Sequence, residues 1–187
     1  MIDQQTIIEQ TKRWISSVVI DLNLCPFAKR VFQADLIKYV VSEATSEEEL
    51  LADLRVELVS LANAPTSQTE TTLLIHPFAL DNFLDFNDFL AIADKLIAQL
   101  ELRGTIQIAS FHPAYRFEGT GPEDVENYTN RSPYPMLHLL REESITKVAS
   151  DEDELLAIPE RNIKLLKSLG REKMLQMLKT IVQDQAS

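Results

Sequence analysis

The five residues Thr71–Ile75, with the sequence TTLLI, decide the fold that the sequence predicts. Their composition favours a β-strand, and the apolar second half indicates a central strand that is covered on both faces. Two similar runs flank it along the chain, LIKYVVS at 36–42 and TIQIASF at 105–111. Segments with helical periodicity separate the three runs. The alternation of strands and helices therefore predicts an α/β protein.

The segments between the strands predict two amphipathic helices. The first covers about 46–62 and begins with a capping box, in which Ser46 is followed three residues later by Glu49. The second begins at Asp85 or Asn87 as its N-cap and ends before a glycine that stops it. Short links between these elements favour right-handed crossovers and parallel strands.

Helices are also predicted at both ends of the chain. Apolar residues repeat with a helical period over 3–21, and Pro26 ends that helix near residue 24 because it restricts the residue before it. Near the C-terminus, three further helices are expected, over about 135–149, 152–169 with a kink or break at Pro159, and 171–183.

Together these elements predict a single globular domain over residues 1–187. Its fold class is α/β, with a small, largely parallel three-stranded core sheet flanked by helices and with extra C-terminal helices. The alternative is a ferredoxin-like α+β arrangement, in which some strand pairings are antiparallel.

The composition limits the partners. The chain has 18 basic and 29 acidic residues, a formal net charge of −11, which opposes binding to nucleic acid. The single cysteine excludes an internal disulfide. We expect a cytoplasmic protein, because the first residues lack the pattern of a signal peptide and no apolar run reaches membrane-spanning length. An anionic small molecule is a possible partner if it meets local positive charge; the sequence does not define an oligomeric state.

Two histidines directly follow predicted strands. His76 stands before Pro77 after TTLLI, and His112 stands before Pro113 after the third strand. The carboxyl ends of parallel strands meet at one edge of a sheet, where ligands of open α/β folds bind. We therefore predict a ligand-binding role for His76 and a catalytic role for His112, with a structural hydrogen-bonding role open for both.

The loop over 113–135 is longer than a connection needs, and it begins within the stretch SFHPAYRFEG. Tyr115 is a further candidate catalytic residue. Arg116 and Arg131 can hold a carboxylate or a phosphate in bidentate contacts. Alternatively, the two arginines pair with carboxylates of the loop and only lock it.

The predicted helix over 135–149 carries a third group of candidates. Ser132 can cap this helix or contact a ligand. His138, Arg141 and Glu142 are spaced i, i+3 and i+4, so on a helix they share one face. Glu142 would then orient His138 in an acid/base pair.

Cys25 lies in the segment LNLCPFAKR, where the first helix ends. A free cysteine is commonly a small buried hydrophobe. A helix C-terminus disfavours a thiolate, whereas Lys29 and Arg30 favour one. Cys25 therefore stands as a ligand-binding candidate, and its reactivity stays open.

A divalent-metal site is a further hypothesis. It would combine His76, His112 and His138 with Cys25 or Glu142, because imidazole and carboxylate or thiolate groups suit such ions. The chain has no local ligand spacing such as HExxH. The sequence therefore leaves the metal and any cofactor unknown.

Two classes of function fit these residues. One is a hydrolase or transferase for an anionic small molecule, with His112 as acid/base, His138 and Tyr115 assisting, and Arg116 and Arg131 holding the anion in a shared cleft. The other is a non-catalytic ligand-binding or protein-interaction module. Whether the protein is an enzyme stays open.

Four features together resemble a bacterial family catalogued as domain of unknown function 1415. They are the segments LNLCPFA, SFHPAYRFEG and NYTNRSPYPMLHLLRE, and the length of 187 residues. The resemblance covers essentially the whole chain and implies a single-domain bacterial protein of the cytosol. It carries over no catalytic residue.

Overall fold

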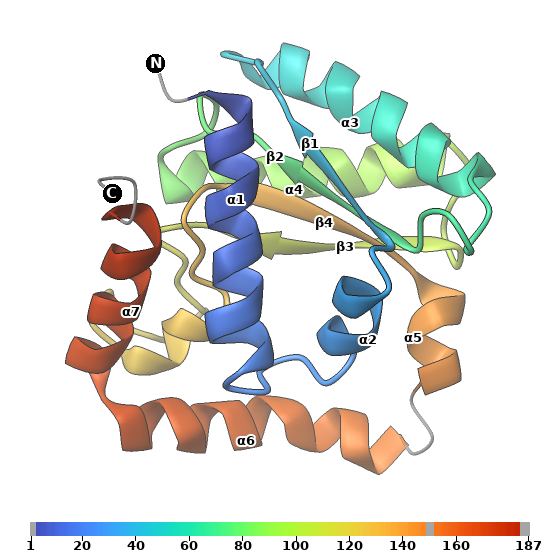
Figure 1. Cartoon of the computed structure of the whole chain (residues 1–187). Coiled ribbons are helices and arrows are strands. Elements are labelled where there is room, and N and C mark those ends of the chain that lie inside the picture. The colour runs from blue at the N-terminus through green and yellow to red at the C-terminus, as the bar shows by residue number, and fades with distance from the viewer. Residues whose placement is uncertain (1–2, 149–151, 184–187) are drawn as a thin grey trace.

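The computed structural model describes residues 3–148 and 152–183, which form a sheet with helices on both faces (Figure 1). The sheet has four strands, in the order β1-β2-β4-β3. They are β1 (Ile37–Val41), β2 (Thr71–Ile75), β3 (Ile106–Phe111) and β4 (Met136–Arg141). β1 and β2 are parallel, whereas β4 runs antiparallel to both β2 and β3.

The α/β class and the three predicted strands are confirmed, but the three-stranded, largely parallel sheet is wrong. The fourth strand, β4, lies within the segment predicted as a helix over 135–149. Its short, mainly aliphatic run, MLHLLR, fits either a helix or a strand. It forms a strand because it pairs with β2 on one side and with β3 on the other. The element order also differs from the ferredoxin-like alternative.

The helices of the described residues are mostly where the sequence places them. They are α1 (Gln4–Trp14), α2 (Ala28–Gln33), α3 (Glu47–Asn63), α4 (Phe83–Gln99), α5 (Glu142–Val148), α6 (Glu152–Leu169) and α7 (Arg171–Gln183). α2 was not predicted, whereas α5 is the part of the helix predicted over 135–149 that the structure does form. α1 continues as a π-helical segment, Ile15–Ile20, a feature that often occurs at functional sites. α6 continues through Pro159, so the helix is not broken there.

The predicted caps are partly confirmed. The hydroxyl of Ser46 accepts a hydrogen bond from the N–H of Glu49 at 3.2 Å, as the capping box predicts. The cap of α4 is Asn82, not Asp85 or Asn87, because Asn82 accepts from the N–H of Leu84 at 2.8 Å. Asp85 instead lies in the first turn, where its charge favours the helix.

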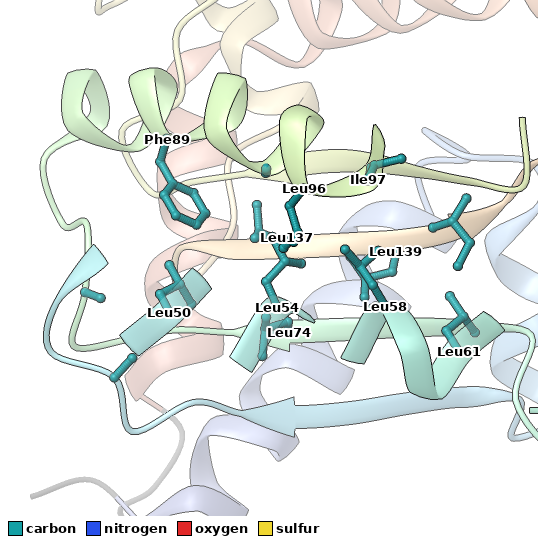
Figure 2. Close-up of a cluster of buried hydrophobic side chains, with 14 of the residues drawn as sticks. Leu50, Leu54, Leu58, Leu61, Leu74, Phe89, Leu96, Ile97, Leu137 and Leu139 are labelled. Atoms are coloured by element: carbon teal, nitrogen blue, oxygen red, sulfur yellow. The ribbon is translucent and has the colours of Figure 1, made fainter. Parts of the chain in front are cut away.

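One hydrophobic core lies between the sheet and the helices α3 and α4 (Figure 2). Its labelled side chains come from α3 (Leu50, Leu54, Leu58, Leu61), from α4 (Phe89, Leu96, Ile97) and from the sheet (Leu74, Leu137, Leu139). A second core on the opposite face packs α1 and its π-helical segment, α6 and α7 against the sheet. β2 contributes Leu74 to the first core and Leu73 and Ile75 to the second, so it is covered on both faces as predicted. Among the described residues, no helix is long and apolar enough to cross a membrane.

Candidate ligand cavity

A cavity of about 290 Å³ lies between the sheet and the segment that links α1 to α2. α1 and its π-helical continuation form one wall, α2 forms another, and the floor is the sheet. The lining residues that matter below are Trp14, Cys25, Phe27, Arg30, Glu70, Thr71, Ala109, Phe111, His138 and Arg141.

The strand register explains why there is room for the cavity above the sheet. Ala109 of β3 pairs with His138 of β4, and both side chains belong to the face of α1. A methyl group beside an imidazole leaves room that a larger side chain would fill. Three aromatic side chains of this lining, Trp14, Phe27 and Phe111, make it largely apolar.

His138 is held in one tautomer by its neighbour on β2. The hydroxyl of Thr71 donates to the carbonyl of Leu139 at 2.6 Å, so it must accept from Nε2–H of His138, also at 2.6 Å. Nδ1 is then an acceptor with a lone pair. No described residue donates a hydrogen bond to Nδ1, and the ring borders the cavity.

Burial lowers the pKa of His138 to about 4. The side chain is half-buried beside the cavity and has no charged partner that would compensate for its desolvation. It is therefore neutral at pH 7, and Nδ1 can accept a hydrogen bond from a bound molecule.

The charged side chains of the lining are paired with other groups. Arg30 of α2 forms an ion pair with Glu70, which precedes β2. Arg141 donates through Nη2 to the carbonyls of Leu61 at 2.6 Å and Ala64 at 2.5 Å, at the end of α3. Arg30 and Glu70 thus compensate each other, whereas Arg141 contacts neutral carbonyls and its buried Nε has no hydrogen-bond partner.

Cys25, a ligand-binding candidate from the sequence, lines the same cavity. Burial raises the pKa of its thiol. The thiol is therefore protonated at pH 7, and its sulfur adds an apolar, polarisable surface to the cavity. Cys25 and His138 thus line the same cavity, although they are far apart in sequence.

The other two histidines lie at one edge of the sheet, as predicted, but on its opposite face. β2 and β3 both run antiparallel to β4, so their carboxyl ends meet at the same edge with the start of β4 between them. His76 and His112 contact Phe86 of α4, with ring centroids 5.6 and 5.1 Å away. Both are buried, at 0% and 1% exposure.

These two histidines hydrogen-bond to the segment that follows β2. His76 Nδ1 donates to the carbonyl of Ala79 at 3.0 Å, and His112 Nε2 donates to the carbonyl of Leu80 at 3.1 Å. His112 Nδ1 accepts from the N–H of Ala114 at 3.0 Å. Burial lowers the pKa of both rings, that of His76 to about 4. The observed contacts are structural ones, and a catalytic role for His112 stays a prediction.

Arg131 locks the loop that the sequence singles out. It donates to the carbonyls of Tyr115 at 3.2 Å and Pro122 at 2.7 Å, and its guanidinium lies 4.5 Å from the ring centroid of Tyr128. Arg116, by contrast, is exposed, and no described residue pairs with it. The ligand-binding roles of Arg116 and Arg131 and the catalytic role of Tyr115 stay predictions.

The predicted face of His138, Arg141 and Glu142 is wrong, because the first two lie on β4 and Glu142 begins α5. Alternation along the strand separates His138 from Arg141, and Glu142 lines a second cavity beside α4. Ser132 does not cap a helix; it donates to the carbonyl of Tyr134 at 2.6 Å.

The predicted cleft shared by His112 and His138 is also not formed, since the two rings lie on opposite faces of the sheet. The same separation prevents the three histidines from binding one metal ion. In the part of the chain that the structure describes, no group of three His, Cys, Asp or Glu side chains is placed to hold a metal.

Sequence reasoning missed Thr71, Ala109 and Glu70 as parts of a site. Thr71 and Ala109 gain their roles from pairing with β4, which was predicted as a helix. Once β4 is recognised as a strand, His138 is opposite Leu73, and a threonine two residues before Leu73, diagonal to the histidine on the same face, is the signal that would have found them.

The fold defines an α/β protein with a mixed four-stranded sheet and a cavity between the sheet, α1 and α2. The chain belongs to the family described as protein of unknown function (DUF1415), whose model matches residues 6–176. The search of curated proteins and the search of solved structures gave no match.

Proposed function

We propose that this protein binds a small, mainly apolar molecule in the cavity between the sheet, α1 and α2. The observation that carries the proposal is the unpaired Nδ1 of His138 inside a lining dominated by apolar side chains. Ligand sites commonly combine such a lining with one or a few placed polar groups. A ligand that donates a hydrogen bond to this nitrogen gains a contact that no described residue provides, so its binding stabilises the folded protein.

The volume supports a small molecule rather than solvent alone. An engineered apolar cavity of about 150 Å³ takes up benzene and stays free of water. The present cavity of about 290 Å³ is roughly twice that size. It therefore suits a molecule with about two rings or an aliphatic body of similar volume.

Catalysis is a second candidate, favoured by the presence of Cys25 and His138 in one cavity. A thiol and an imidazole are the nucleophile and base of many hydrolases and transferases. In that case Nδ1 of His138 would take the proton that the thiol loses as its sulfur attacks the substrate. The raised pKa of Cys25 favours the binding role, because the thiol is protonated before any substrate arrives.

The strand-edge site for an anionic substrate remains a separate hypothesis. Its support is the exposed guanidinium of Arg116 beside the half-buried Tyr115. The structure uses His112 and Arg131 for contacts within the protein, so this site lacks its expected acid/base and one of its two expected anion-binding arginines.

The test of the proposed function is a thermal-shift titration with naphthalene as the probe. A ligand at 100 times its dissociation constant stabilises the native state by about 2.7 kcal/mol. Ala109→Phe fills the cavity from its floor and should abolish the shift. The matched control is Ser110→Val on the opposite face of β3, which should keep it. Equal shifts in both variants would show that the probe binds elsewhere.

A further inference from the structure

We infer that the ligand of this cavity is a neutral molecule with an apolar body of about two rings and one O–H or N–H group that donates to Nδ1 of His138. The inference rests on the proposed function and adds the chemical class of the ligand. It follows from three features of the cavity: the direction of its hydrogen bond, its charge and its walls.

The direction of the hydrogen bond is fixed within the sheet. The Thr71 hydroxyl has one proton, and that proton goes to the carbonyl of Leu139. His138 must therefore place its own proton on Nε2, which leaves Nδ1 as an acceptor. Turning the ring around would lose the bond to Thr71, so the ligand has to supply the donor.

The charge of the lining favours a neutral ligand. A carboxylate or a phosphate has only acceptors and would oppose the lone pair of Nδ1. Arg30 could offset that only by giving up Glu70. Arg141 has an unpaired Nε, but its Nη2 is directed to carbonyls at the end of α3, and alternation along β4 places its side chain on the opposite face from His138. A cationic ligand would need a carboxylate as its partner, and the carboxylate of Glu70 is already paired with Arg30.

The walls favour flat, apolar groups. Trp14 and Phe111 pack edge to face, with ring centroids 5.2 Å apart. The indole N–H of Trp14 donates to the carbonyl of Arg131 at 3.1 Å, so its polar atom is already used. Of the other uncharged polar side chains in the lining, Gln107 is exposed, Ser144 of α5 is half-buried, and the hydroxyl of Thr71 is already engaged. His138 therefore offers the polar contact deep in the cavity.

The experiment compares three probes of similar size by isothermal titration at pH 7.5: 2-naphthol, 2-methoxynaphthalene and 2-naphthoate. We expect 2-naphthol to bind roughly five- to tenfold more tightly than 2-methoxynaphthalene, as one net hydrogen bond allows. Hydrophobicity alone predicts the opposite order, since the methyl ether is the more apolar molecule. We expect 2-naphthoate to bind more weakly than either.

Two variants test the role of His138. His138→Phe keeps a ring but removes the acceptor. In this variant 2-naphthol and 2-methoxynaphthalene should bind with about the same affinity. Thr71→Val removes the oxygen that fixes the tautomer, so the preference should fall there too. This second variant serves as the test if His138→Phe does not fold.

The outcomes separate the inference from the proposed function. If both neutral probes bind equally and Ala109→Phe abolishes both, the cavity binds apolar molecules but the assigned donor is wrong. The assignment of a neutral ligand is wrong if 2-naphthoate binds most tightly. If no probe binds to the unmodified protein, the proposed function fails, and the inference fails with it.

Discussion

Thr71 of β2 and His138 of β4 lie diagonally across the two neighbouring strands, and the hydroxyl accepts the imidazole N–H at 2.6 Å. Because the hydroxyl also donates to the carbonyl of Leu139, this one residue sets which nitrogen of His138 carries the proton. The pair links the order of the sheet to the chemistry of the candidate site.

Replacement of Thr71 by valine should destabilise the protein by about 1–3 kcal/mol. The variant leaves the Nε2–H of His138 and the carbonyl of Leu139 without this partner, and unpaired buried polar groups cost that much. The matched control is Thr72→Val, because the hydroxyl of Thr72 is buried without a hydrogen-bond partner. That control should be neutral or stabilising in urea unfolding. Equal losses in both variants would contradict the assigned role of Thr71.

Stability should decrease as the pH falls from about 6.5 to about 4. The folded pKa of His76 and of His138 is about 4, below the ordinary value of 6.5. In this pH range the unfolded chain binds more protons than the folded protein does. Each of the two histidines therefore lowers the free energy of unfolding as the pH falls. The loss is on the order of 3 kcal/mol per histidine at the lower end.

Urea unfolding at several pH values between 7.5 and 4.5 measures this dependence. In the His138→Phe variant, the free energy of unfolding should fall less over this pH range, by about the contribution of one histidine. The variant removes one of the two groups with a strongly lowered pKa. An unchanged slope in this variant would show that His138 is not buried in the neutral form.

Removal of the Arg30 side chain should speed ligand exchange with little effect on stability. α2 has no fully buried residue and covers one side of the cavity, where Arg30 pairs with Glu70. The arginine side chain is 52% exposed, so the pair contributes only about 0–1 kcal/mol. In stopped-flow experiments with 2-naphthol, Arg30→Ala should raise both rate constants severalfold. Lys29→Ala, outside the cavity lining, is the control and should leave both unchanged.

Cys25 provides a direct probe of the cavity because it is the only cysteine of the chain. Its raised pKa predicts slow alkylation by iodoacetamide at pH 7.5 and a steep increase of the rate at higher pH. A ligand in the cavity should protect the thiol further, by at least severalfold at saturation. Alkylation that is fast and insensitive to 2-naphthol would place the thiol outside the binding site.

The two loop arginines should behave differently from each other. Arg131→Ala should cost roughly 2–4 kcal/mol, because it removes two charge-assisted hydrogen bonds and a cation–π contact. Arg116→Ala should leave the melting temperature unchanged, since Arg116 is exposed. If Arg116→Ala instead abolishes the binding of an anionic metabolite, the strand-edge hypothesis gains support over the cavity.

The sequence predicted the parts of the fold that depend on local patterns. TTLLI was recognised as a strand covered on both faces, and the helix cap at Ser46 was located correctly. β4 was missed because MLHLLR has both helical and strand character, and only its position between β2 and β3 resolves the ambiguity. That single error moved His138 to a helix and hid its pairing with Thr71.

The candidate site was therefore only partly predictable. Cys25 and His138 were both named from the sequence, but nothing local shows that they line one cavity. His112 and Arg131 attract attention through their residue types, yet the structure uses them to hold loops. A contact that depends on cross-strand register cannot be read before the strands are paired correctly.

The most direct test of the account is a crystal structure of the protein grown with 2-naphthol. We predict that the naphthalene rings lie between Trp14 and the sheet, with the hydroxyl oxygen about 2.7–3.0 Å from Nδ1 of His138. A bound probe with its hydroxyl directed away from His138, or a probe bound elsewhere while the cavity remains empty, would contradict the central claim.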